Sequence, residues 1–226
     1  MIIIGNGRLI TRNAAEPYYE NGAVVTENEL IKETGTTAEM RLKYPDAEFV
    51  DAKGGVIMPA FINAHTHIYS ALARGLSIAG YNPTNFYEVL DGMWWKIDRS
   101  LTLEDTRRSA YTTIIDCIKT GCTTIFDHHA SFCQIEGSLF AIADAAKALG
   151  IRACLCYEVS ERDGEKKCDE SIEENKSFID HCERENDPML KAMFGGHALF
   201  TIGDKTFEKC VKANGGRTGF HIHVCE

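Results

Sequence analysis

Two histidines, His65 and His67, stand one residue apart at the end of the apolar run VIMPAFINAHTH. Side chains at positions i and i+2 of a strand point the same way, so the two imidazoles would project together. Paired neutral imidazoles at a strand end suit Zn²⁺ or Fe²⁺. Burial with hydrogen bonds to backbone carbonyls is the alternative, and it fits a lone histidine better than a pair. The spacing therefore predicts that His65 and His67 bind a metal ion.

The stretch HIHVCE repeats this spacing with His221 and His223 and ends in Glu226. Both histidines face the same side of a strand, and His223 lies nearer its carboxyl end. We therefore predict that His223 is a third ligand and that His221 is a core histidine one layer deeper. A metal-bound water has to lose a proton and a leaving group has to gain one. Glu226 is predicted to move this proton, although without the histidines it would be an ordinary surface glutamate.

Two further polar clusters end strand-like runs. His197 follows two glycines, and glycine lets a backbone approach a ligand closely. It is predicted either to contact substrate or a developing oxyanion, or to be a buried structural histidine. Asp127, His128 and His129 end another run, and alternation allows only one of these two histidines to face the interior, where either could contact substrate.

The pattern of the chain changes after residue 57. Residues 1–57 alternate apolar and polar residues between Asn-Gly and Gly-Gly turns, which predicts short strands. Residues 58–226 alternate strand-like runs with helical segments, one of which opens on a Thr-x-x-Asp capping box at Thr102. The predicted strands are 56–64, 123–126, 152–159, 190–194 and 218–224, and the predicted helices are 102–120, 138–149, 169–185 and 204–214, with the helical stretch NFYEVLDGMWWKID inserted after the first strand.

This order predicts parallel βα units of an α/β fold. A dinucleotide-binding sheet would need G-x-G-x-x-G, which is absent, whereas polar clusters at several strand ends favour a (β/α)8 TIM barrel. About five of the eight strands are recognisable, and a complete barrel takes about 250 residues. We therefore expect residues 58–226 to be the N-terminal portion of a barrel. By itself it would be inactive, and its open edges would favour aggregation or a homo-oligomer.

The composition of the chain limits the kinds of partner and the location that it can have. The chain of 226 residues has 24 basic and 33 acidic side chains and no basic stripe, which argues against a nucleic-acid partner. Its apolar runs are too short for a membrane span, and the apolar run at its N-terminus is too short for a secretory signal. We therefore expect a cytoplasmic protein. The nine cysteines form no C-x-x-C pair, which excludes a zinc ribbon and a thioredoxin motif.

The motifs resemble a known family. VIMPAFINAHTH is similar to the opening motif of the amidohydrolase superfamily, in its cytosine-deaminase-like or chlorohydrolase branch, with Ala60 where glycine is usual. GGHALFT resembles the substrate-contacting histidine motif of this branch, and HIHVCE resembles its His-x-x-Glu motif. Together with LDGMWWKIDRSLT and GCTTIFDHHAS, the pattern looks most like the group of aminohydrolases called SsnA.

This resemblance implies a TIM barrel preceded by a small β-sandwich segment. It implies one divalent metal ion per active site, zinc before iron, bound by His65, His67 and His223, with Glu226 as proton shuttle and His197 as substrate contact. The implied reaction is hydrolytic deamination or dechlorination of a small nitrogen heterocycle, at carbon–nitrogen bonds other than peptide bonds. A further histidine and an aspartate of the family's site would lie beyond residue 226.

Two alternatives remain open at this point. A binuclear cyclic-amide hydrolase would need a carboxylated lysine at the end of the fourth strand, where His197 stands, and Lys191 is at its beginning. A binding homologue without activity is the second. Trp94, Trp95 and Tyr81 in the inserted segment could line a pocket for a flat ring or could be core residues.

Overall fold

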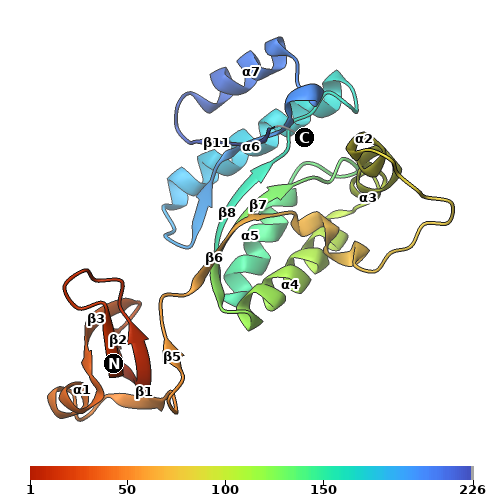
Figure 1. Cartoon of the computed structure of the whole chain (residues 1–226). Coiled ribbons are helices and arrows are strands. Elements are labelled where there is room, and N and C mark those ends of the chain that lie inside the picture. Colours follow the sequence, from red (N-terminus) through yellow and green to blue (C-terminus); the bar gives the residue numbers. More distant parts are fainter. Residues whose placement is uncertain (225–226) are drawn as a thin grey trace. The chain divides into compact units, whose positions relative to one another are not determined.

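The computed structural model describes residues 1–224 and divides the chain into two compact units (Figure 1). The first unit is Met1–Ala60 and the second begins at Phe61. The sequence analysis placed the boundary between the two domains three residues earlier, between residues 57 and 58. Glu226, the predicted proton shuttle, and Cys225 lie outside the described residues.

The first unit is a small sheet with one helix. Its strands have the order β3-β2-β1-β4, with β5 beside β1; β1, β2 and β3 are antiparallel, and β4 and β5 run parallel to β1. A capping box of Thr36 and Glu39 begins the helix. The elements are β1 (Ile2–Ile10), β2 (Tyr18–Glu27), β3 (Leu30–Thr36), α1 (Thr37–Lys43), β4 (Glu48–Asp51) and β5 (Val56–Ile57).

The prediction of one continuous strand over 56–64 is wrong. Val56–Ile57 pairs with β1 of the first unit, and a new strand begins at Phe61 in the second. Pro59 lies between them, and proline has no N–H for a sheet ladder and restricts the residue before it. The apolar run therefore contributes one strand to each of two sheets.

The second unit is built on parallel strands, as the sequence predicts. One ladder has the order β6-β7-β8-β9, β10 pairs with β11, and a parallel bridge between Val159 and Gly196 connects the chain after β8 to β10. The predicted strand 190–194 is thus two strands, interrupted at Met193. The strands are β6 (Phe61–Thr66), β7 (Cys122–His129), β8 (Arg152–Tyr157), β9 (Leu190–Ala192), β10 (Phe194–Ala198) and β11 (Phe220–His223).

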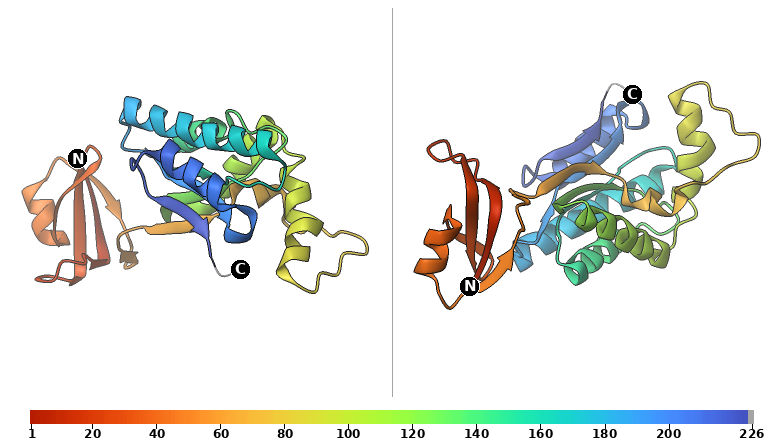
Figure 2. Two further views of the ribbon diagram at one scale, coloured as in Figure 1. Left: turned by 90° about the horizontal axis from the view of Figure 1, so that it is seen from above. Right: turned by 60° about the horizontal axis from the view of Figure 1, so that its bottom comes forward.

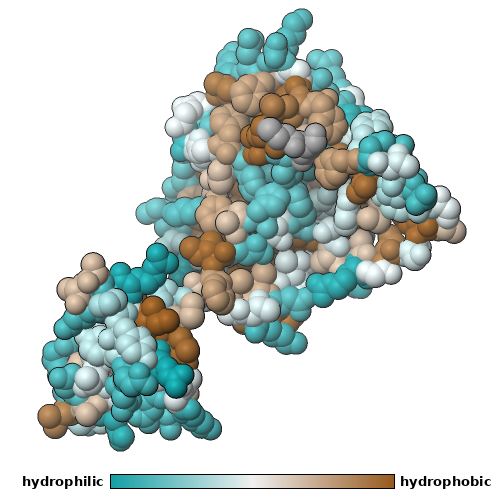
Figure 3. Space-filling view, in the orientation of Figure 1, coloured by the Kyte–Doolittle hydropathy of each residue, from teal (hydrophilic) through white to brown (hydrophobic). Residues whose placement is uncertain are grey.

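Within the described residues this parallel arrangement is an incomplete TIM barrel. Strands β6 and β11 each pair on one side only, so the ladder is open. Phe61 and Ile62 of β6 are more than half exposed. Figure 3 shows exposed apolar side chains, in brown, on the face of this unit turned to the viewer.

Four longer helices follow the strands: α4 (Leu103–Lys119), α5 (Ser138–Leu149), α6 (Glu165–Glu185) and α7 (Asp204–Asn214). The capping box of Thr102 and Asp105 begins α4 as predicted, and α5 ends at Gly150 in the left-handed conformation. Helix α6 begins four residues before its predicted start. Helices α4 and α5 lie side by side (Figure 2) and pack Ile114 and Ile142 into the core against β7 and β8.

The inserted segment between β6 and α4 is helical but irregular. It contains η1 (Ile68–Ala73), α2 (Phe86–Val89), a π-helical turn η2 (Leu90–Trp94) and α3 (Trp95–Asp98). The part of the chain that the structure describes contains no helix that is both long and apolar enough to cross a membrane.

Candidate metal centre

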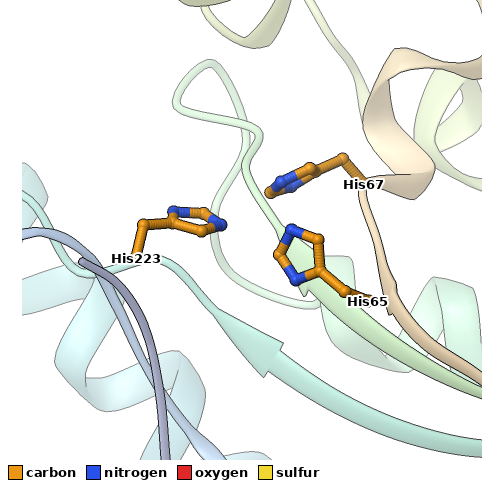
Figure 4. Close-up of side chains that lie close together, drawn as sticks. All are labelled: His65, His67 and His223. Atoms are coloured by element: carbon orange, nitrogen blue, oxygen red, sulfur yellow. The ribbon is translucent and has the colours of Figure 1, made fainter. Parts of the chain in front are cut away.

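Three predicted ligands come together in the structure. His65 and His67 lie at the carboxyl end of β6 and His223 ends β11. One nitrogen from each ring lies within 4.8 Å of the others, and the ring centroids are 4.7 to 5.1 Å apart. Figure 4 shows the three rings turned toward one another. We refer to His65, His67 and His223 as the histidine cluster; three imidazole nitrogens facing one point match a zinc site.

Hydrogen bonds of the other ring nitrogens prepare two of these histidines for a metal. The Nδ1 of His67 lies 2.8 Å from the carbonyl oxygen of His128, so Nδ1 carries the proton and Nε2 keeps its lone pair. The Nδ1 of His65 lies 2.8 Å from Nε2 of His221. If Nδ1–H of His65 donates there, its Nε2 is also free to bind.

This contact corrects one prediction. His221 is not a core histidine one layer deeper, because it is only partly buried and bonds directly to His65 at the carboxyl end of the strands. Strand alternation put it on the correct face, but its depth depends on how β11 lies opposite β6.

The backbone after His67 is held in place from neighbouring elements. The carboxylate of Asp127 accepts a hydrogen bond from the N–H of Ile68 at 2.7 Å, and Ser109 of α4 donates to the carbonyl of Ile68. The hydroxyl of Ser70 donates to the carbonyl of His67 at 2.8 Å. These contacts restrict the backbone that carries His65 and His67 before any ligand binds.

Burial keeps these imidazoles neutral. Together with the nearby His128 it lowers the pKa of His67 to about 4 and that of His223 to about 3. The same causes lower the pKa of His221 to about 4. Neutral rings keep the lone pairs that a metal ion needs.

A cavity of about 320 Å³ opens at the histidine cluster. We call it the histidine cavity; one wall is apolar, and Trp94, named as a candidate pocket residue, is part of it. Tyr81 is not among the described residues that line it. The lining residues are His65, His67, Tyr69, Ser70, Phe86, Leu90, Trp94, Glu158, His197 and His223.

His197 lies in this cavity and is 4% exposed. Its Nδ1 is 2.8 Å from the hydroxyl of Thr201, which itself donates to the carbonyl of Ala198 at 3.0 Å. The Nδ1 of His197 is therefore the protonated nitrogen, and its Nε2 is an acceptor. Gly195, two residues before His197, allows β10 to pack closely against the end of β8. A Cβ at this position would lie 2.2 Å from the carbonyl oxygen of Tyr157.

His128 and His129 are both fully buried, and neither lines the cavity. His128 supports the histidine cluster, with its ring 4.5 Å from that of His223 and its Nε2 donating to the carbonyl of Gly196 at 2.9 Å. His129 points elsewhere, toward Ser131 and Tyr157.

The sequence analysis missed Glu158, which follows β8 and lines the histidine cavity. Its carboxylate is buried with Arg162, whose guanidinium also pairs with Asp98. Glu158 lies inside a predicted strand, and its place at the carboxyl end of an apolar run was the only available indication.

A second, more open cavity of about 440 Å³ lies on the other side of the inserted helical segment. Arg162 and Thr201 belong to its walls, so it is separated from the histidine cavity by the partners of Glu158 and His197. Its lining residues are Tyr87, Asp91, Trp95, Arg99, Glu161, Arg162, Phe200 and Thr201.

The chain is similar to known proteins of one family over nearly all of its length. Residues 56–226 match the model described as the amidohydrolase family, and residues 22–47 match that of an imidazolonepropionase-like composite domain of bacteria. A 5'-deoxyadenosine deaminase of Methanosarcina barkeri is 30% identical over 226 residues, which are 100% of this chain and 49% of the relative. The chain thus spans about half the length of the curated relatives it matches.

Solved structures share the fold. An atrazine chlorohydrolase from Arthrobacter aurescens complexed with zinc has a TM-score of 0.78 at 19% identity, over 100% of this chain and 53% of that one. An adenosine deaminase from Xanthomonas campestris with bound zinc has a TM-score of 0.76 at 20% identity, over 98% of this chain and 48% of that one.

Proposed function

The chain belongs to the amidohydrolase family, and from this premise we propose that the protein is a zinc-dependent aminohydrolase that deaminates a small nitrogen heterocycle. The observation that carries the proposal is the histidine cluster, in which three neutral imidazoles converge at the wall of the histidine cavity. A zinc ion held there would supply the Lewis acidity that makes water nucleophilic near neutral pH.

In this proposal each residue of the site has a separate role. His65, His67 and His223 would hold the ion; the carbonyl of His128 holds the ring of His67 in position, and His221 holds that of His65. Glu226 takes the proton from the water and returns it to the leaving nitrogen. His197 contacts the substrate, and its neutral Nε2 accepts a hydrogen bond from it. Phe86, Leu90 and Trp94 provide an apolar wall for a flat ring.

The proposed substrate is an aminopurine or its nucleoside, since the relative from Methanosarcina barkeri is named for 5'-deoxyadenosine. Dechlorination is the neighbouring activity, suggested by the fold shared with the atrazine chlorohydrolase. We propose a single metal ion rather than two, because Lys191 lies in β9, is exposed and does not line the histidine cavity. A cytoplasmic location, a capacity to form homo-oligomers and the SsnA-like identity remain predictions from the sequence.

The test uses the intact, zinc-loaded protein. Metal analysis should find about one zinc per active site, and ammonia release should be measured with 5'-deoxyadenosine, adenine and 2,6-diaminopurine, with chloride release from atrazine in parallel. We expect ammonia from at least one purine. Stoichiometric zinc without any product would instead support a binding homologue, and chloride without ammonia would assign the protein to dechlorination.

A further inference from the structure

Glu158 is the only carboxylate among the described residues that line the histidine cavity. Its side chain is 3% exposed, and it follows β8 directly at the carboxyl end of the parallel strands. The proposed reaction uses Glu226 for proton transfer and leaves Glu158 without a role. A buried carboxylate that meets a substrate cavity requires an explanation, because removing its charge from water is costly.

The need for a negative charge beside Arg162 does not explain why the carboxylate of Glu158 is buried at the cavity. The Nη2 of Arg162 is 3.1 Å from Oε1 of Glu158, but the guanidinium also holds Asp98 through two contacts of 2.5 and 3.3 Å. Asp163 lies 3.2 Å from Nη1 of the same guanidinium. Asp163 also pairs with Arg99 at 2.7 Å, so two cations face three carboxylates, and burial raises the pKa of Asp98 to about 7. The network thus holds one carboxyl group more than it has cations.

The carboxylate of Glu158 still has capacity to accept hydrogen bonds. Two carboxylate oxygens offer about four lone-pair positions. Arg162 uses one of them, and Oε2 lies 3.6 Å from Nδ1 of His128, beyond ordinary hydrogen-bond length. At least one oxygen can therefore meet a donor inside the cavity.

Its surroundings keep Glu158 ionised. Burial raises its pKa, but the guanidinium of Arg162 at 3.1 Å helps to hold the pKa of the carboxyl well below its usual range. The second polar group at this wall, Nε2 of His197, is also an acceptor in the tautomer that Thr201 imposes. The wall between β8 and β10 thus offers acceptors and needs donors from whatever binds.

We propose that Glu158 determines specificity by accepting a hydrogen bond from an N–H or O–H group of the substrate, at an edge away from the amino group that leaves. This inference rests on the proposed function and narrows its substrate class to heterocycles that carry a second donor. The donor could be an amino group of the base or a hydroxyl group of an attached sugar. A substrate without such a donor leaves a buried charge unpaired and binds weakly.

The test compares matched compounds on the intact, zinc-loaded protein. For the base, 2,6-diaminopurine is compared with 2-chloroadenine, which replaces the second amino group by a chlorine atom. For the sugar, 5'-deoxyadenosine is compared with its analogues lacking the 2'- or the 3'-hydroxyl. Both kcat/KM and the equilibrium Kd are measured for wild type, Glu158→Gln and Asp163→Asn. Asp163 is the matched control because it also pairs with Arg162 and does not line the cavity.

We expect wild type to prefer the donor in at least one comparison by about 10- to 100-fold, the usual value of a hydrogen bond to a charged group. Glu158→Gln should reduce this preference to a few-fold, while Asp163→Asn should keep it. Zinc content and thermal unfolding confirm that both variants fold. A preference that survives in Glu158→Gln, or equal loss in Asp163→Asn, would show a structural role and overturn the inference.

The Kd values separate the two proposals. If wild type binds the donor compounds selectively through Glu158 but releases no ammonia, the proposed reaction is wrong and the inference stands. If wild type releases ammonia without any donor preference, the reaction stands and the inference is overturned. A wild-type protein that binds none of the compounds overturns the inference as well.

Discussion

The carboxyl ends of the strands and the layer between strands and helices bury opposite kinds of side chain. Asp127, His128 and Glu158 are at most 2% exposed at the strand ends, whereas Ile114 and Ile142 fill the layer beneath α4 and α5. Among the described residues, Asp127 Oδ2 is buried without a hydrogen-bond partner at the strand ends. Buried polar groups cost stability. The contrast indicates that the apolar layer beneath the helices stabilises the fold. The carboxyl ends of the strands instead bury polar groups, which lowers stability but places these groups at the candidate site.

The strongest test of this contrast removes a ligand from the polar region. His67→Ala deletes one of the proposed metal bonds, so zinc should no longer be bound stoichiometrically and turnover should be abolished, while the fold remains. Metal analysis and ammonia release on the same preparation measure both effects. His181→Asn on α6 is the control. Full zinc content in His67→Ala would remove that residue from the metal site.

The next test separates proton transfer from metal binding. Glu226→Gln should keep zinc and lower turnover by about 10²–10⁴-fold, the usual contribution of a positioned acid–base group. Steady-state kinetics beside metal analysis provide the measurement. Turnover close to that of wild type would exclude Glu226 as the proton shuttle.

The converse test makes a cavity in the apolar region. Ile142 of α5 is fully buried, and Ile142→Ala should lower the free energy of unfolding by about 2–5 kcal/mol. Zinc affinity and KM should remain as in wild type at temperatures where the variant is folded. Urea unfolding and zinc titration report the two properties separately, and a parallel loss of zinc affinity would contradict the division into two regions.

The smallest effect concerns the metal-free protein and pH. Burial lowers the pKa of His67 to about 4 and that of His223 to about 3, from 6.5. The unfolded chain therefore takes up protons first as the pH falls below 6.5, so stability is full above that value and decreases between 6.5 and about 3. Urea unfolding with a chelator, at about pH 7.5 and about pH 5, should show the lower midpoint at the lower pH. Equal midpoints would mean that these rings are not buried without metal.

Local rules predicted the parts of the site that depend on one strand. The i, i+2 spacing put His65 with His67 on one side of β6, and strand ends in a parallel fold brought His223 near them. The capping box at Thr102 and the glycine after α5 marked helix ends for equally local reasons.

The missed features depend on contacts between distant segments. The surroundings of Glu158 depend on Asp98 of α3 and Arg162, which meet beside it from positions 60 and four residues away in the sequence. The position of His221 depends on how β11 lies opposite β6. No periodicity within a strand contains this information.

The π-helical turn at Leu90–Trp94 has an evolutionary consequence. Residues spaced by four along this segment line the same cavity, and the residue that follows each of them lines the other cavity. Because each residue turns a helix by about 100°, inserting one residue before the turn would move the side chains of the histidine cavity to the second cavity. Deleting one would bring those of the second cavity to the histidine cavity, and neither change would alter a histidine. We therefore expect relatives to diverge in substrate range through length changes in this segment. The residues involved are Phe86, Leu90 and Trp94 on the histidine cavity and Tyr87, Asp91 and Trp95 on the second cavity.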